Sequence, residues 1–111
     1  MCGIVGAYSV ATKISSDATI IAMRDSMFHR GPNGAGLWRD PHEKCVMGHR
    51  RLSIIDLSVS ATQPMLNPQG TIAVVFNGEI YNHEALRAEL KATGKYQWRT
   101  DHSDTEVLLY A

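Results

Sequence analysis

The chain has 111 residues, 44% of them hydrophobic and 20% charged, which suits one small globular domain and is too short for two. Eleven basic residues balance eleven acidic ones, so the charge gives no sign of a surface for nucleic acid or an anionic membrane. No apolar run approaches the roughly 18 residues of a spanning helix, and the start lacks the basic region of a signal peptide.

The first half of the chain predicts one helix among short strands. Residues 2–10 are typical of a mostly buried strand. Apolar residues at helical spacing predict a helix over residues 17–29, capped by Ser16 or Asp17 and stopped by Gly31-Pro32. Three further strands are expected at residues 36–39, 45–49 and 52–55.

A long polar segment separates the two halves. Residues 56–70 are rich in Ser, Pro, Asn and Gly and predict a surface loop, and loops of this length are often functional. Residues 71–76 favour a strand, Asn77-Gly78 a turn, and residues 79–81 a second extended run. Together they predict a hairpin.

Two helices are expected in the second half. Asn82 is placed to cap a helix over residues 83–93, with Leu86 and Leu90 facing inward and Gly94 ending it. Residues 96–99 favour a short strand. Residues 103–106 form a capping-box pattern that begins a last helix.

Cys2 is the first candidate for chemistry. If an aminopeptidase removes Met1, residue 2 carries a thiol and a free α-amine, whose pKa near 8 lets it take the thiol proton. Nucleophile and base would then be one residue. The alternative is a small apolar residue that opens a buried strand.

Two polar pairs offer binding groups. Asn77-Gly78 is commonly a plain turn, but it also supplies a side-chain amide and a backbone N–H, the two donors of an oxyanion hole. Arg50-Arg51 is either a solvated charge pair or a fork for a carboxylate.

Other kinds of site are not indicated. The glycine-rich residues 29–36 follow a helix instead of a strand, which excludes a dinucleotide fingerprint. The five histidines lack ligand spacing, so we expect no metal site. Two cysteines make no disulfide framework, and we expect free thiols and a cytoplasmic protein.

Six motifs in order carry a family resemblance. They are Cys2-Gly3-Ile4-Val5-Gly6, His29-Arg30-Gly31-Pro32, His49-Arg50-Arg51-Leu52-Ser53-Ile54-Ile55-Asp56, Gln63-Pro64-Met65, Phe76-Asn77-Gly78-Glu79-Ile80-Tyr81-Asn82 and Ser103-Asp104-Thr105-Glu106. The series strongly resembles the glutaminase domain of class II glutamine amidotransferases, which are N-terminal-nucleophile hydrolases. Within that class it is most similar to asparagine synthetases, although sugar-modifying amidotransferases on the same plan share these motifs.

The resemblance implies a fold and a set of roles. The fold would be α+β, with two antiparallel sheets between helical layers, and residues 1–111 would be the N-terminal part of that domain. The implied catalytic residues are Cys2 as nucleophile with Asn77 and Gly78 as oxyanion donors. The implied glutamine-binding residues are Arg51 for the α-carboxylate, Glu79 and Asp104 for the α-ammonium, and Leu52, Ser53, Ile54 and Ile55 along the pocket.

The resemblance also implies partners. Ammonia would pass to a C-terminal synthetase domain in cis that uses ATP and Mg²⁺ to amidate an acceptor. The resemblance makes aspartate the expected acceptor, and no cofactor is expected in this segment. Two other hypotheses stay open. One is a hydrolase of another amide, against which the amino-acid clamp argues. The other is a non-catalytic domain with a structural Cys2.

Overall fold

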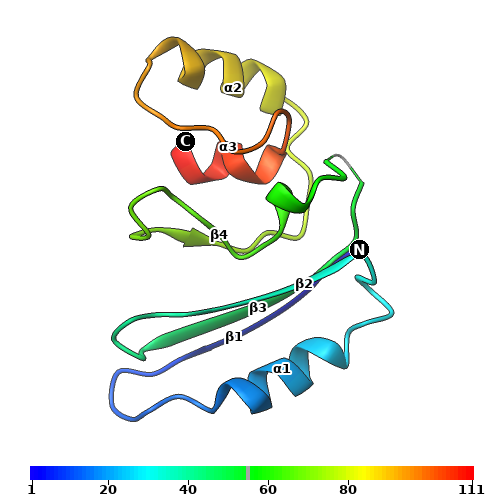
Figure 1. Cartoon of the computed structure of the whole chain (residues 1–111), viewed down its shortest axis with the longest axis vertical. Coiled ribbons are helices and arrows are strands. Elements are labelled where there is room, and N and C mark those ends of the chain that lie inside the picture. Colours follow the sequence, from blue (N-terminus) through cyan, green and yellow to red (C-terminus); the bar gives the residue numbers. More distant parts are fainter. Residues whose placement is uncertain (55) are drawn as a thin grey trace.

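The computed structural model describes residues 1–54 and 56–111. The elements in chain order are β1 (Gly3–Tyr8), α1 (Asp17–Asp25), β2 (Gly34–Arg39), β3 (Cys45–Arg51), the 3₁₀ turn η1 (Val59–Ala61), β4 (Met65–Leu66), β5 (Ala73–Val74), α2 (His83–Ala92) and α3 (Asp104–Tyr110). They are stacked in layers: α1, the sheet β1-β3-β2, the sheet β4-β5, α3 and then α2 (Figure 1). The predicted α+β fold with two antiparallel sheets between helical layers is confirmed.

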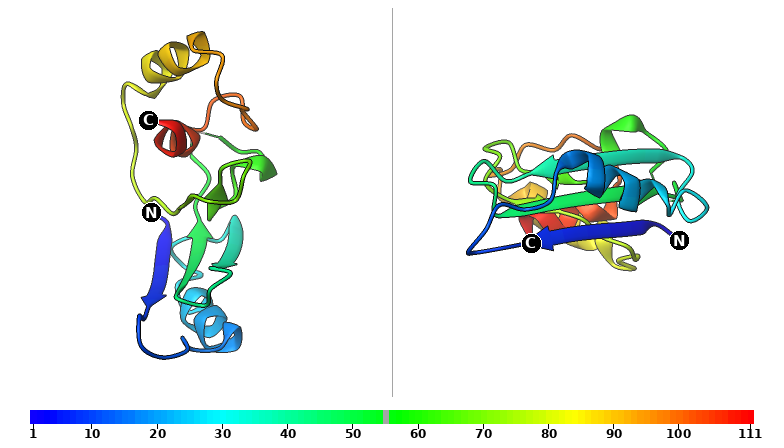
Figure 2. Two further views of the ribbon diagram at one scale, coloured as in Figure 1. Left: turned by 90° about the vertical axis from the view of Figure 1, so that its left-hand side faces the viewer. Right: turned by 90° about the horizontal axis from the view of Figure 1, so that it is seen from below.

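The larger sheet has β3 at its centre, antiparallel to both neighbours. Its pairing with β1 sets Gly3 opposite Arg50, and the N-terminus therefore lies beside the end of β3. One face of this sheet packs on α1 through the buried Val5, Ile20 and Val46. The N-terminus lies at the junction between the two sheets in both Figure 1 and the left panel of Figure 2.

Helix α1 begins as predicted but is shorter. The Ser16 hydroxyl accepts a hydrogen bond from the helix, which is the expected cap. The helix ends at Asp25 instead of residue 29, because the N–H groups of residues 27 and 28 donate to carbonyls three residues back, which tightens the chain into turns. The chain then passes close to β3. A Cβ on Gly31 would lie 2.4 Å from the carbonyl carbon of Arg50.

The prediction of a strand at residues 52–55 is wrong for residues 52–54, which the structure describes. The backbone N–H of Leu52 donates to the Cys2 sulfur, and that of Ser53 donates to the Asn33 side chain. These N–H groups are thus bonded to side chains and join no strand. Ile55 lies outside the described residues.

The hairpin is also displaced from its predicted place. Strands β4 and β5 pair with each other, so the predicted loop 56–70 contains η1 and β4. The turn between them is held by the Asn67 side-chain oxygen, which accepts from the N–H groups of Thr71 and Ile72, with Gly70 at a φ of 69°. The predicted turn at Asn77-Gly78 therefore joins no paired strands.

Helix α2 ends as predicted, with Gly94 at a φ of 67°. Asn82 is at the N-cap position, as predicted, but its side chain makes no capping bond. Leu86 and Leu90 are half-buried, while the buried side chain of this helix is Arg87.

The segment before α3 differs from the prediction in two features, the capping box and the short strand. The Glu106 carboxylate accepts from the N–H groups of residues 99 and 100, so it does not reach back to Ser103 as a capping box would. The strand predicted at residues 96–99 is also absent, and its last N–H, that of Arg99, is bonded to this carboxylate. Helix α3 nevertheless starts at Asp104, directly after the predicted cap residue.

Candidate active site

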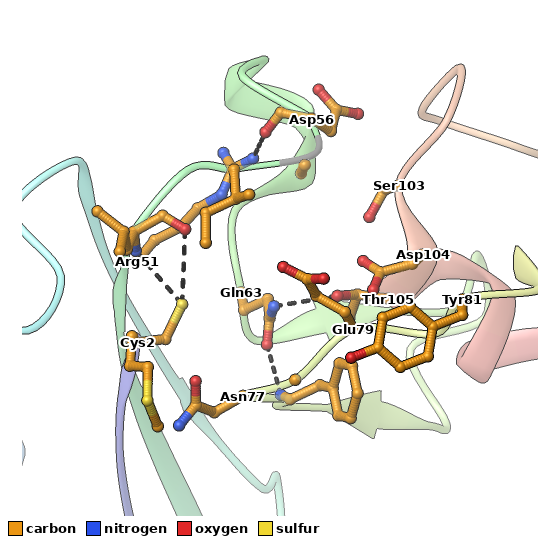
Figure 3. Close-up of a pocket in the computed structure, with 16 residues that line it drawn as sticks. Cys2, Arg51, Asp56, Gln63, Asn77, Glu79, Tyr81, Ser103, Asp104 and Thr105 are labelled. Carbon is orange, nitrogen blue, oxygen red and sulfur yellow. Dashed lines mark hydrogen bonds between the residues drawn. The ribbon is translucent and has the colours of Figure 1, made fainter.

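A cavity of about 370 Å³ lies where the N-terminus meets the segments that follow β3 and β5. Four segments line it: residues 1–2, the stretch after β3, the stretch after β5, and the start of α3. The predicted site residues in its wall are Cys2, Arg51, Leu52, Ile54, Asn77, Gly78, Glu79 and Asp104. Residues distant in sequence thus come together at one pocket (Figure 3).

Cys2 is held between its own strand and the end of β3. The Leu52 N–H donates to the sulfur at 3.3 Å, and the thiol donates to the Leu52 carbonyl at 3.7 Å. Arg30 donates from Nε to the Cys2 carbonyl at 3.2 Å. The thiol and its backbone are therefore both fixed, and the side chain is partly exposed to the pocket. Met1 is present and also lines the cavity.

Arg51 is buried at the end of β3, with 8% of its surface exposed. Its guanidinium donates to the carbonyls of Ser58, at 2.6 Å, and Asp56. These contacts use two of the five N–H donors of a guanidinium, so donors remain for a ligand in the cavity. The same bonds fold the stretch after β3 over the pocket (Figure 3).

Asn77 and Gly78 line the cavity at the turn after β5. Figure 3 shows Asn77 on the side of the pocket where Cys2 lies. The turn is fixed by Gln63, whose side-chain oxygen accepts from the Phe76 N–H at 2.6 Å. The Gln63 amide nitrogen donates in turn to the Thr105 hydroxyl. Gly78 has no room for a side chain, because a Cβ there would lie 2.7 Å from the Phe76 ring.

Two carboxylates face the cavity from the other side. Asp104 is the first residue of α3 and is 7% exposed, and it accepts from the Ile80 N–H at 3.0 Å. Glu79 is exposed. In Figure 3 both project from the side opposite Cys2 and Arg51. These two carboxylates thus lie across the pocket from the cation Arg51.

One described residue of the predicted site does not join the wall. Ser53 lies outside the cavity lining, and its N–H is bonded to Asn33. Ile55 lies outside the described residues. Arg50, the other member of the arginine pair, points to the opposite face of the sheet, where it contacts Asp25 and lies 4.7 Å from the centre of the Phe28 ring.

Sequence reasoning missed several polar residues of the wall, among them Asp56, Gln63 and Ser103. All three stand in the motifs quoted above, but without a role. Asp56 is buried, which raises the pKa of its carboxyl. Hydrogen bonds from Ser58 and the positive charges of His102 and Arg51 outweigh burial, so the pKa lies below its usual value. Asp56 is therefore an anion beside Arg51.

His49 lies in β3, two residues before Arg51, and is fully buried. Among the described residues neither ring nitrogen has a hydrogen-bond partner. Burial lowers its pKa to about 4, and the charge of Arg51 adds to this, although the nearby Phe76 backbone acts in the opposite direction. His49 is thus a neutral ring behind the pocket wall.

Among residues 1–54 and 56–111, no group of three His, Cys, Asp or Glu side chains is arranged to hold a metal ion. None of the helices in this part of the chain is long and apolar enough to cross a membrane. Both cysteines are free thiols.

Comparisons with known proteins give the family. The model of the glutamine amidotransferase domain family matches residues 1–111. The chain is 44% identical over 112 residues to asparagine synthetase (glutamine-hydrolyzing) 1 of Bacillus subtilis, 42% over 113 residues to a probable asparagine synthetase of Dictyostelium discoideum, and 39% over 110 residues to asparagine synthetase B of Escherichia coli. These matches cover 98–99% of the chain and 17–19% of each relative. The chain therefore belongs to the glutamine amidotransferase domain family.

Proposed function

We propose that this chain hydrolyses the side-chain amide of glutamine with Cys2 as the nucleophile, and that the ammonia released serves an ATP-dependent amidation of aspartate. The observation that carries the proposal is the convergence on one cavity of a thiol, a side-chain amide next to a glycine, a cation, and the carboxylates of Glu79 and Asp104. An amino acid with an amide side chain needs each of these groups.

Binding would use the two charged ends of the pocket. Arg51 would receive the α-carboxylate with its remaining donors, and Asp104 with Glu79 would receive the α-ammonium. The backbone along Leu52 and Ile54 would form the wall between them. A glutamine held in this way would present its side-chain amide to the thiol.

The chemistry would begin once Met1 is removed. The freed α-amine of Cys2 takes the thiol proton, and the sulfur attacks the amide carbon. The amide oxygen becomes an oxyanion, which the Asn77 side-chain NH₂ and the Gly78 N–H would stabilise. The C–N bond then breaks, the α-ammonium returns the proton to the leaving nitrogen, and ammonia departs. Water hydrolyses the thioester to glutamate and restores the thiol.

The acceptor reaction rests on the relatives alone. Those named above are asparagine synthetases, and the chain spans less than a fifth of their length. We propose that a C-terminal synthetase domain in cis, with ATP and Mg²⁺, consumes the ammonia in the cytoplasm.

The experiment is to measure glutamate released from glutamine by the full-length protein, together with its intact mass. We expect a mass without Met1 and glutamate formation that requires Cys2. Retention of Met1 in an active preparation would contradict the mechanism. An asparagine product from aspartate, ATP and glutamine would test the acceptor.

A further inference from the structure

A buried polar cluster outside the cavity holds the start of α3. It consists of Arg87 on α2, Thr100 in the connecting segment and Glu106 on α3, which are 6%, 5% and 1% exposed. We call it the Arg87 cluster. None of the three lines the cavity that holds Cys2. Figures 1 and 2 show α2 lying over α3, on the side away from the sheets.

The three side chains of the cluster are joined by hydrogen bonds centred on Thr100. The Glu106 carboxylate accepts from the Arg99 N–H at 2.6 Å, from the Thr100 N–H at 2.8 Å and from the Thr100 hydroxyl. Arg87 donates to the Thr100 carbonyl at 2.8 Å and to the Thr100 hydroxyl at 3.2 Å. Its guanidinium also lies 3.7 Å from Glu106 and stacks 4.2 Å from the centre of the Trp98 ring.

The cluster forms hydrogen bonds to both the carbonyl and the N–H of Ser103. The Ser103 carbonyl accepts from Arg87 at 2.7 Å, and the Ser103 N–H donates to the Thr100 hydroxyl at 3.3 Å. The next residue is Asp104, whose carboxylate faces the cavity. The backbone that the cluster holds is therefore directly bonded to Asp104.

We propose that Thr100, Glu106 and Arg87 are positioning residues that fix the Asp104 carboxylate where it can receive the α-ammonium of glutamine. This inference rests on the proposed function, which gives Asp104 that role. The cluster holds the peptide, and the Asp104 side chain is locked from the other side by the Ile80 N–H. A carboxylate fixed by such bonds loses little entropy when the ligand arrives, which strengthens binding.

The test compares Thr100→Val with Thr100→Ser in the full-length protein. Valine keeps the shape but removes the hydroxyl that bonds Glu106, Arg87 and Ser103, whereas serine keeps the hydroxyl. We expect Thr100→Val to raise the KM for glutamine about tenfold with little change in kcat, because a displaced carboxylate weakens a charged hydrogen bond. Thr100→Ser should stay near the wild-type KM.

A ligand without the α-ammonium separates positioning from general damage. Glutaramate, which is glutamine without its α-amino group, needs Arg51 but not Asp104. Its inhibition constant should be the same in the wild type and in Thr100→Val. Glu106→Gln should behave as Thr100→Val does, while Glu89→Gln, the same change at an exposed site on α2, should have no effect. Equal weakening of glutamine and glutaramate in the Thr100→Val protein would overturn the proposal.

Asp104→Asn keeps the two proposals distinguishable. If it raises the KM for glutamine and Thr100→Val does not, the positioning role is wrong and the role of Asp104 stands. If Asp104→Asn leaves the KM unchanged, the role proposed for Asp104 is wrong, and the positioning role is overturned with it.

Discussion

The thiol of Cys2 and the backbone of Leu52 are bonded in both directions: the Leu52 N–H donates to the sulfur at 3.3 Å, and the thiol donates to the Leu52 carbonyl at 3.7 Å. These bonds tie Cys2 to the segment after β3, 50 residues away. They hold the sulfur in the wall of the cavity. They also give Cys2 a structural contact, which must be separated from its chemical role.

Cys2→Ser makes that separation. Serine keeps a small polar side chain beside Leu52, but an amine of pKa near 8 activates a hydroxyl far less readily than a thiol. We expect glutamine hydrolysis by Cys2→Ser to fall below about 1% of wild type, with an unchanged melting temperature. Cys2→Ala should also abolish hydrolysis, while synthesis with free ammonia should persist because ammonia bypasses the thiol. Glutamine-dependent activity in Cys2→Ala would contradict the proposed function.

Arg51→Lys should act on binding. Lysine keeps the charge, but it loses the planar fork that reaches the carbonyls of Asp56 and Ser58 and leaves donors for a carboxylate. We expect the KM for glutamine to rise about 10- to 100-fold, with a smaller change in kcat. The matched control is Arg50→Lys on the opposite face of the sheet. A similar rise in KM for both variants would show that the effect is not specific to the pocket.

Asn77→Ala should act on the chemical step. The Asn77 amide is the donor proposed to meet charge that develops only during the reaction. Its loss should lower kcat by about 10²- to 10³-fold with little change in KM. Steady-state kinetics of glutamate release would measure this. An effect confined to KM would contradict the oxyanion assignment.

The order of motifs made the contents of the pocket predictable, and Cys2, Arg51, Asn77 and Asp104 do line one cavity. Their roles stay predictions. What local pattern could not give was the use of side chains as partners for backbone N–H groups. No strand forms at residues 96–99, and the N–H groups of Arg99 and Thr100 donate to the Glu106 carboxylate. Such partners are set by tertiary packing, which local sequence patterns do not report.

Gly36→Ala tests the contact between β2 and the segment that leads into β4. A Cβ on Gly36 in β2 would lie 1.8 Å from the Gln63 carbonyl oxygen, and Gln63 fixes the turn that bears Asn77. We expect a loss of about 1–3 kcal/mol in the free energy of unfolding together with reduced glutamine hydrolysis. The control is Gly6→Ala in β1, where the nearest atom would be 3.7 Å away. Equal stability of the two variants in urea unfolding would contradict the close approach.

His49 should make the free energy of unfolding depend on pH. Burial lowers its pKa from 6.5 to about 4 in the folded protein, whereas the unfolded chain keeps the ordinary value. Between these values the unfolded state binds more protons, so the free energy of unfolding should fall as the pH drops from about 6.5 to 4. Above that window the contribution is fully present.

The size of this effect can be isolated with His49→Leu. Between pH 7.5 and 5 a shift of this size contributes a loss of about 2 kcal/mol from His49 alone. Leucine has a similar volume and no proton to gain, and it removes two ring nitrogens that have no hydrogen-bond partner among the described residues. Urea unfolding at the two pH values should therefore show a smaller acid loss in the variant than in the wild type. An identical loss in both proteins would mean that His49 is protonated in the folded state, and that its ring is not sealed from water behind the pocket wall.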